Sequence, residues 1–291
     1  MDYHHDRFED FSLMVYKDES LFALLPANRK LTTLYSHQGL SYGGLLLKDD
    51  ADFNSVLEGF KSVLQFLKTL SIEELQLKLV PKHYHQLPSD EMDYLLFILK
   101  AELVRRDITS TIDCSNRQKI TSSNRKRGLK KAIKNELKVK EVNGFAEFWN
   151  HILIPNLKAK HNTKPVHTLE EIELLKAKFP KQIRQFNVYN NNDVVAGVTI
   201  FETKTVAHAQ YISANEQKQE LGSLDILFDQ LINTTYKNKR YFDFGISNEN
   251  QGKQINKGLL SWKESFGAQA MVHDHYTIKT KDVERLDAVL I

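Results

Sequence analysis

Two residues in the carboxyl-terminal third of the chain have types and positions suited to chemistry at a carbonyl group. Asp243 stands between two phenylalanines of a short apolar segment, so in a strand it points to the face opposite both rings. Lys263 follows Leu259 by four positions at the edge of a helical apolar stripe, where its ammonium can reach into a cleft. Transfer of an acyl group to an amine needs an oriented carbonyl, oxyanion stabilisation and removal of an amine proton. We take Lys263 as the candidate for the oxyanion, and Asp243 as the candidate proton acceptor or orienter of the amine.

Both residues also have a structural interpretation. A lysine at a helix edge commonly lays its aliphatic stem over apolar neighbours and keeps its ammonium in water. An aspartate within a strand can accept hydrogen bonds from a neighbouring turn. The loop after the strand contains Asn248, Asn250 and Gln251, whose donors could grip an acceptor molecule, although surface loops are polar in general.

Hydrophobic periodicity predicts the elements that position these residues. Apolar side chains recur at helical spacing in residues 53–67 and 223–238, and Thr168 with Glu171 forms the capping-box pattern of a helix start. Strands, helix, strand, helix and strand follow one another in each half of the chain. We therefore predict an α+β protein of two similar domains, each with a mixed, mainly antiparallel sheet flanked by helices. The expected domains are residues 1–120 and 121–291, with the last strand packing on the first domain.

Composition limits the classes of function. The chain has 291 residues, one cysteine and a formal net charge of +3, which is too small to indicate a nucleic-acid partner by itself. A single cysteine excludes an intrachain disulfide and a zinc cluster built from cysteines. No run approaches the roughly 18 apolar residues of a membrane span, and the first residues lack the pattern of a signal peptide. We expect a cytoplasmic protein without a membrane span.

Three segments resemble a known family. They are Tyr-Phe-Asp-Phe-Gly-Ile at 241–246, Gly-Leu-Leu-Ser-Trp-Lys-Glu-Ser-Phe-Gly at 258–267, and the basic segment 122–132. Their order resembles the GNAT-type N-acyltransferase superfamily in tandem, and more narrowly the Fem-type family of peptidoglycan bridge-forming aminoacyltransferases. Trp262 stands where that family usually has phenylalanine, and the chain has no room for the coiled-coil arm of some Fem-type enzymes.

The resemblance implies a bacterial transferase with two GNAT-like domains. Such an acyltransferase would move an acyl or aminoacyl group onto an amine of a cell-envelope precursor, either an amino sugar or a peptide. Its donor would be acyl-CoA or aminoacyl-tRNA, and its matching lysine, here Lys263, would lie at the reacting centre. The alternative is a non-catalytic module of the same fold that binds a nucleotide sugar or a polymer.

Two segments are candidates for holding phosphate. The basic helix predicted near residues 123–137 carries Arg125, Lys126 and Lys130, which could face a nucleotide sugar, coenzyme A or transfer RNA, or could form an ordinary solvated face. Gln219 and Gly222 precede a helix where GNAT enzymes place a phosphate-binding turn. There Leu224 replaces a small residue, while Glu220 and Asp225 add negative charge.

A further set of residues could line a cleft. His161, Lys164 and His167 lie in a loop before the capped helix, and His37 and Tyr42 flank a glycine-containing turn that could approach an acceptor. Pro165 and the two glycines after Tyr42 explain these loops equally well as plain turns.

Metal binding and recognition of DNA are not expected. The pairs His83/His85 and His273/His275 each place two imidazoles on one side of an extended segment, but neither has a nearby third ligand of recognisable spacing. No helix-turn-helix pattern accompanies the basic helix. Binding of RNA through that helix is a third, weaker interpretation.

Overall fold

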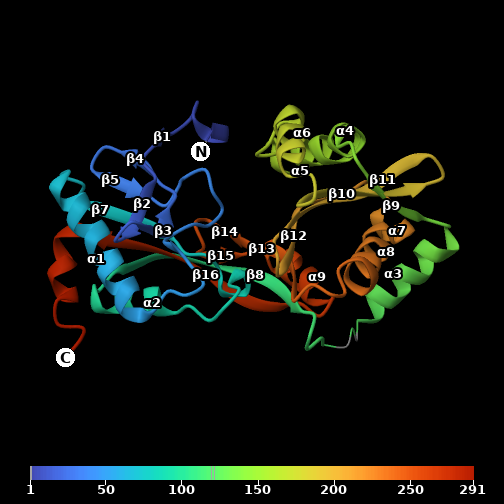
Figure 1. The fold of residues 1–291 in the computed structure, drawn as a ribbon. Coiled ribbons are helices and arrows are strands. Elements are labelled where there is room, and N and C mark those ends of the chain that lie inside the picture. The colour runs from blue at the N-terminus through green and yellow to red at the C-terminus, as the bar shows by residue number, and fades with distance from the viewer. Residues whose placement is uncertain (1, 119, 121) are drawn as a thin grey trace. The chain divides into compact units, whose positions relative to one another are not determined.

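The computed structural model describes residues 2–118, 120 and 122–291, which form two compact units (Figure 1). Unit 1 runs to Asp107 and also includes Asn248–Gln254 and Val272–Ile291. Unit 2 comprises Ile108–Ser247 and Ile255–Met271. Both units are therefore discontinuous in sequence.

A mainly antiparallel sheet forms the centre of unit 1. Its strands are neighbours in the order β1 (Glu9–Asp10), β4 (Asn28–Lys30), β5 (Thr33–Tyr35), β7 (Glu74–Lys78), β16 (Gln269–Lys279) and β8 (Glu102–Asp113). The pair β5–β7 is parallel, whereas β1–β4, β4–β5 and β7–β16 are antiparallel. A smaller sheet contains β2 (Leu13–Lys17), β3 (Ser20–Leu25) and β6 (Leu46–Leu47).

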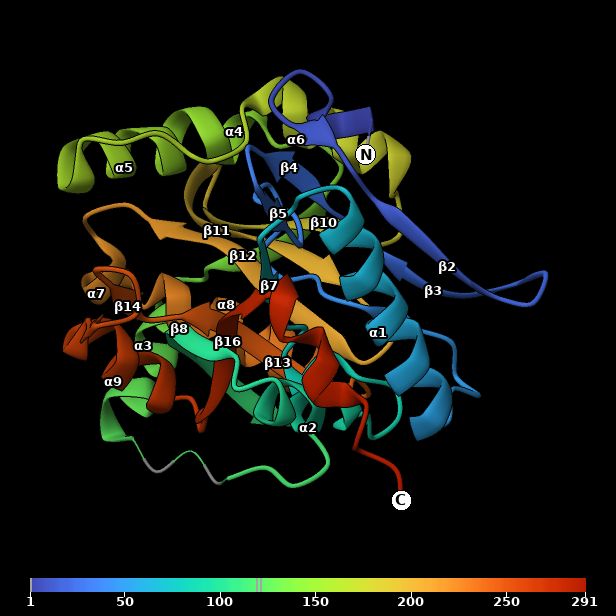
Figure 2. The same cartoon turned by 90° about the vertical axis from the view of Figure 1, so that its left-hand side faces the viewer.

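Helix α1 (Phe53–Thr69) covers the core of unit 1. Its start is fixed by Asp52, whose carboxylate accepts a hydrogen bond from the backbone N–H of Ser55 at 2.9 Å. The predicted apolar stripe is confirmed: its first member, Phe53, is half-buried, and the others are buried, namely Val56, Leu57, Phe60, Val63, Leu64 and Leu67. A 3-10 helix, Thr280–Leu286, lies beside α1 (Figure 2), and α2 (Glu91–Ile98) adds to the same core.

Helix α2 ends earlier than the apolar spacing predicts. The stripe predicts helix to about Leu103, but Lys100 takes a left-handed backbone conformation with φ of 53° and ends the turn. Strand β8 then begins at Glu102, whereas the sequence pattern predicts a strand over residues 108–113. Leu103 fits both the helical period of α2 and a position in a strand, so the apolar spacing alone did not distinguish the two.

Unit 2 contains a second, mainly antiparallel part of the sheet. Its strands are neighbours in the order β8, β13 (Tyr241–Ile246), β12 (Val206–Ala214), β11 (Asp193–Glu202), β10 (Ile183–Asn190) and β9 (Lys138–Val142). Strands β10 and β11 form a hairpin, as the apolar segments 184–189 and 194–202 around the turn residues 190–193 predict. Strands β14 (Asn248–Glu249) and β15 (Gln254–Ile255) make a separate short pair.

The parallel pair β12–β13 separates after three residues. Val206, Ala207 and His208 are opposite Tyr241, Phe242 and Asp243, and no further register exists although both strands continue. We call this point of separation the β12–β13 fork, and it is defined by His208 and Asp243. Backbone groups beyond such a fork are not paired across it, which leaves them for other partners.

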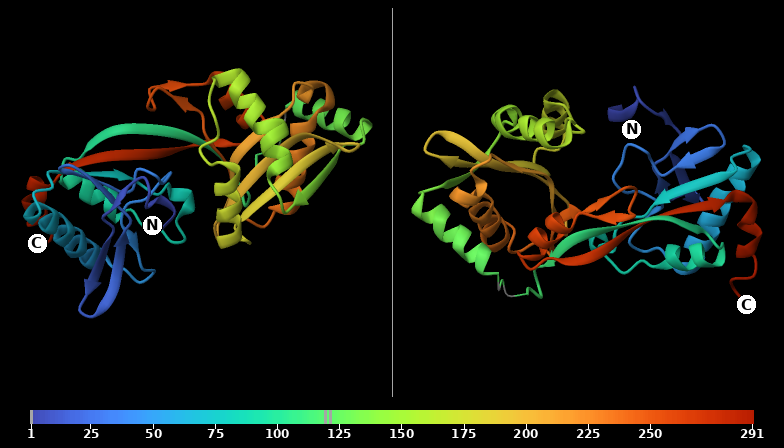
Figure 3. Two further views of the ribbon diagram at one scale, coloured as in Figure 1. Left: turned by 90° about the horizontal axis from the view of Figure 1, so that it is seen from above. Right: turned by 180° about the vertical axis from the view of Figure 1, so that it is seen from behind.

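Helices cover both faces of the sheet in unit 2 (Figures 1 and 3). One face packs on α3 (Ser123–Lys134), α7 (Lys218–Leu221) and α8 (Ser223–Gln230), and the other on α4 (Ala146–Phe148), α5 (Ile154–His161) and α6 (Leu169–Lys178). The capping box of α6 is present as predicted. The π-helical turn Trp149–Leu153 lies between α4 and α5. A second, Leu231–Thr235, follows α8 and ends the helix that the apolar spacing predicts to about residue 238. The predicted fold class, a mixed, mainly antiparallel sheet flanked by helices, is confirmed.

Candidate active site

Asp243 is a buried hydrogen-bond acceptor at the β12–β13 fork. Its side chain is 3% exposed, on the face of β13 opposite Phe242 and Phe244, which belong to the core of unit 2. One carboxylate oxygen accepts from the hydroxyls of Thr109 and Thr111 and from the backbone N–H of Gly245. Several donors converging on one oxygen stabilise the carboxylate charge in a buried position.

The second oxygen of Asp243 is paired with a histidine that the sequence analysis missed. The Nδ1 of His208 lies 2.8 Å from Asp243 Oδ2, and the His208 side chain is about one-fifth exposed. Because a carboxylate accepts, Nδ1 carries the proton, and the neutral ring then presents its lone pair at Nε2. This pairing depends on the parallel register of β12 and β13, for which the sequence of β12 alone gives no signal.

Lys263 is buried rather than extended into water. It lies in α9 (Lys257–Glu264), which Asn256 caps by accepting a hydrogen bond from the N–H of Leu259. The Lys263 ammonium donates to the carbonyls of Gly245 at 2.8 Å and Ile246 at 2.7 Å, just beyond the fork. Burial lowers the pKa of Lys263 to about 8, and the charge of Asp243 opposes that shift.

The arrangement of these residues is suited to two functions that acyl transfer requires. The His208–Asp243 pair has the arrangement of a general base held by a carboxylate. Lys263 is a buried cation whose third N–H is not used by its two carbonyl acceptors. The structure thus brings Asp243 and Lys263 to one end of β13, and their catalytic roles stay predictions.

The predicted acceptor-gripping loop belongs to unit 1. Asn248 donates to the carbonyl of Gly252 at 3.1 Å, and Gln251 accepts from Arg105 at 2.8 Å. Asn250 and Gln251 both have positive φ and shape the turn. All of these contacts are within unit 1, and the acceptor role of the loop stays a prediction.

The basic helix α3 is partly engaged within unit 2. Arg125 pairs with Asp225 of α8 at 2.8 Å and stacks its guanidinium 5.1 Å from the ring centre of Phe266. Lys126 and Lys130 are exposed. Two of the three candidate phosphate ligands of α3 are therefore open to solvent, while Arg125 is bound to a carboxylate.

The turn before α8 packs closely against α3. A Cβ added at Gly222 would lie 2.1 Å from the carbonyl oxygen of Gly128, and the Gln219 carbonyl accepts from Lys131 at 2.9 Å. Asp225 stands in the first turn of α8, and burial raises its pKa to about 6. A phosphate bound at this helix start would meet this carboxylate and the backbone of α3.

The remaining predicted cleft residues of unit 2 belong to the end of α5 and the loop after it, which are distant in sequence from His208 and Asp243. His161 ends α5, and Lys164 is exposed in the following loop. His167 is tied into the core: its Nδ1 lies 2.6 Å from the Tyr211 hydroxyl, and its carbonyl accepts from Trp149. His167 thus has a packing role in the described structure.

His37 and Tyr42 belong to unit 1. His37 is 1% exposed, its Nδ1 accepts from the N–H of Gly39, and burial lowers its pKa to about 4. The Tyr42 ring lies 4.6 Å from Tyr84 and 6.2 Å from His273, centre to centre. Neither residue lines the cavity described next.

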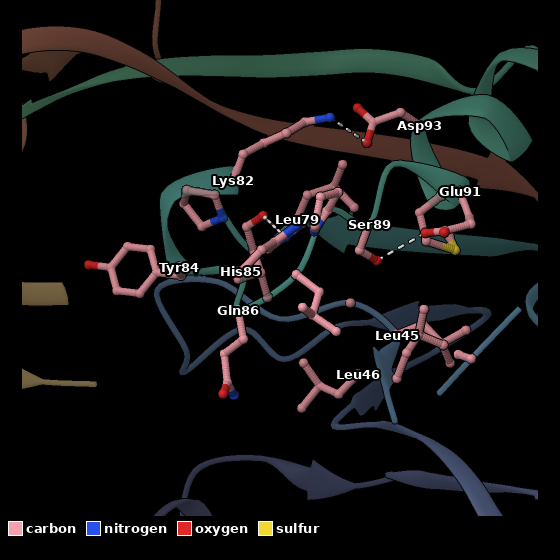
Figure 4. A pocket seen from close by; sticks show the side chains of 18 of the residues that line it. Leu45, Leu46, Leu79, Lys82, Tyr84, His85, Gln86, Ser89, Glu91 and Asp93 are labelled. Atoms are coloured by element: carbon pink, nitrogen blue, oxygen red, sulfur yellow. Dashed lines mark hydrogen bonds and ion pairs between the residues drawn. The ribbon is translucent and has the colours of Figure 1, made fainter. Parts of the chain in front are cut away.

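Unit 1 contains a cavity of about 290 Å³, near the lower end of ligand-site volumes (Figure 4). Leucines form much of its wall, including Leu45, Leu46 and Leu79. Its polar rim includes Lys82, which pairs with Asp93 at 3.1 Å, and Ser89, which donates to Glu91 at 3.0 Å. The cavity has room for a small amphipathic group.

Unit 1 also corrects the expectation that His273 and His275 lack a third ligand. Asp107 of β8 lies beside both imidazoles of β16, and ligand atoms of the three residues are all within 4.8 Å of one another. The missing partner was distant in sequence and is brought close by the sheet.

Solved structures confirm the expected fold. FemX has a TM-score of 0.66 and 10% identity, with 98% of this chain and 92% of FemX covered. The C-terminal domain of a protein assigned as a lysylphosphatidylglycerol synthetase from Agrobacterium fabrum has a TM-score of 0.62 and 10% identity, with 96% and 87% covered. L-PGS from Bacillus licheniformis has a TM-score of 0.58 and 10% identity, also with 96% and 87% covered. The chain therefore shares the fold of FemX and of these two lysylphosphatidylglycerol synthetase structures.

Other comparisons give no match. No model of a protein family matches the sequence, and no curated protein is similar to it. In the described part of the chain, no helix combines the length and apolar character needed to cross a membrane.

Proposed function

We propose that this protein is a GNAT-type acyltransferase that moves an aminoacyl group onto an amine of a cell-envelope precursor. The observation that carries the proposal is the His208–Asp243 pair at the β12–β13 fork, with the Lys263 ammonium bound to the carbonyls of Gly245 and Ile246 in β13. The names of the similar structures, FemX and a lysylphosphatidylglycerol synthetase, support transfer of an aminoacyl group.

Each residue has one role in the proposed reaction. The acceptor amine attacks the acyl carbonyl, a C–N bond forms, and His208 Nε2 takes the amine proton. Asp243 holds the ring and stabilises the imidazolium that results. Lys263 stabilises the oxyanion through its third N–H. The tetrahedral intermediate then collapses, and the leaving oxygen of the donor ester takes the proton from His208.

The packing of α3 supports an aminoacyl ester over coenzyme A as donor. A coenzyme bound at the α8 start would place phosphate beside the Asp225 carboxylate, and Gly222 packs directly against α3. The start of a helix binds an anion where its backbone N–H groups are accessible and no carboxylate lies beside the anion. Exposed Lys126 and Lys130 could contact the phosphates of transfer RNA instead.

The test is a transfer assay with two donors and matched variants. Purified protein is incubated with aminoacyl-tRNA or acetyl-CoA and with a nucleotide-linked amino sugar or its peptide as acceptor, and the amide product is quantified by mass spectrometry. We expect His208→Asn to lower kcat/KM by about 10²–10⁴. His151→Asn is the control, because His151 is an exposed histidine outside the fork. Equal activity of His208→Asn and the unmodified protein would contradict the proposal.

The unit 1 cavity favours a second candidate, a non-catalytic module that binds a small ligand. Its leucine wall and charged rim are those of a binding site, and none of the fork residues lines it. Binding of a nucleotide sugar that is weakened by Leu79→Arg, with no turnover of either donor, would favour the module over the enzyme.

A further inference from the structure

We propose that Asp107, His273 and His275 of unit 1 bind one divalent transition-metal ion, with zinc the best match to the donor set. Two imidazole nitrogens and a carboxylate oxygen are the ligands of many zinc sites with three protein donors. Among the described residues, the fold brings the potential metal-ligand atoms of these three side chains close together. The inference is independent of the proposed acyl transfer.

The strongest observation is a set of buried polar atoms without partners. Asp107 is 1% exposed and His273 is 8% exposed. Asp107 Oδ1, His273 Nε2 and His275 Nε2 are all buried, and none has a hydrogen-bond partner among the described residues. Burying polar groups without partners is unfavourable, so three such atoms in one place indicate a common partner.

The spacing fits a shared ion better than direct hydrogen bonding. His275 Nε2 lies 3.8 Å from Asp107 Oδ2, which is too long for a hydrogen bond. Two ligands about 2.0–2.1 Å from a tetrahedral zinc lie about 3.3 Å apart. Small side-chain rotations therefore bring all three ligand atoms, now within 4.8 Å, to one ion.

Neighbouring groups orient the carboxylate and are themselves engaged. Arg105 Nε donates to Asp107 Oδ2 at 2.8 Å, which leaves Oδ1 for the metal, as outer hydrogen bonds do around metal-bound carboxylates. Arg105 also donates to Gln251, and the Lys78 ammonium donates to the carbonyl of Leu40 at 2.7 Å. The positive charges of Arg105 and Lys78 repel a bound metal ion, but both side chains already donate hydrogen bonds to these acceptors.

The donor set selects the class of metal. Imidazole nitrogen suits zinc, cobalt, nickel and copper, whereas magnesium and calcium prefer oxygen ligands alone. Three protein ligands leave a fourth tetrahedral position for water or for an atom of a ligand. The proposed site is thus open at one position.

Metal titration tests the proposal. Metal-free protein without an affinity tag is titrated with ZnCl₂ in a calorimeter, and Co²⁺ is added in parallel to record the visible spectrum of the bound ion. We expect one equivalent of zinc, a higher Tm with zinc, and a tetrahedral Co²⁺ spectrum. His275→Gln and Asp107→Asn should each weaken zinc binding at least tenfold, with the fold checked by circular dichroism.

His85→Gln is the matched control. His85 also belongs to a pair of histidines two residues apart in unit 1, but its Nε2 bonds to the Val80 carbonyl. The control should bind zinc as the unmodified protein does. The proposal is wrong if the unmodified protein binds no zinc, or if the folded Asp107 and His275 variants bind it unchanged. In either case, water would be the better partner for the three buried atoms.

Discussion

At the residue scale, burial of the Lys263 ammonium predicts that the proposed activity falls at alkaline pH. The pKa of Lys263 is lowered to about 8, so the fraction of charged ammonium falls as the pH rises through that value. A cation that stabilises an oxyanion is needed in its charged form. We therefore expect kcat/KM to fall above about pH 8, and Lys263→Arg to move this fall to higher pH, since arginine stays protonated.

The pH profile of kcat/KM measures this, with product quantified at constant ionic strength. His151→Asn should keep the alkaline fall of the unmodified protein. If activity instead rises through pH 8 in a Lys263-dependent way, Lys263 acts as a base. A profile that Lys263→Arg leaves unchanged would make its two carbonyl bonds purely structural.

At the scale of elements, the sequence predicted the features that depend on local periodicity, turns and caps. The helix at α1, the β10–β11 hairpin and the α6 capping box depend on neighbours a few residues apart, and all are present. The prediction placed Asp243 on the strand face opposite Phe242 and Phe244, and Lys263 at the edge of a helical apolar stripe, for the same reason. His208 and Asp107 were missed because their partners are set by pairing between strands remote in sequence. Neither pairing has a local signature.

A glycine in β11 provides a prediction at this scale. A Cβ at Gly197 would lie 2.5 Å from the ring of Phe148, which packs between α4 and the sheet. Gly197→Ala should therefore lower the free energy of unfolding by about 1–3 kcal/mol through overpacking. Urea unfolding measures the change, and Gly144→Ala is the control, because a Cβ at Gly144 has no described neighbour within 4 Å. Equal stability of the two variants would show that Phe148 moves freely, against the tight packing described.

At the scale of the whole molecule, the residues of the two proposed sites lie in different units. The fork residues His208, Asp243 and Lys263 all lie in unit 2, whereas the leucine-walled cavity and the Asp107 cluster lie in unit 1. Variants in one unit can therefore be tested for effects on the chemistry assigned to the other. Zinc bound in unit 1 need not change transfer at the fork, and an assay with and without metal separates the two proposals.

The stability of the whole chain should fall in mild acid through a buried histidine. The folded pKa of His37 is about 4, mainly because of burial and then of the nearby His4, whereas an unfolded histidine has a pKa of about 6.5. Between these values the unfolded chain binds more protons, so stability decreases as the pH falls from about 6.5 to 4. Asp10 opposes the shift and Lys78 adds to it. Tm measured across this range should decline less steeply in His37→Gln than in the unmodified protein, with exposed His151→Gln as the control. Parallel slopes in all three proteins would assign the acid sensitivity to groups other than His37.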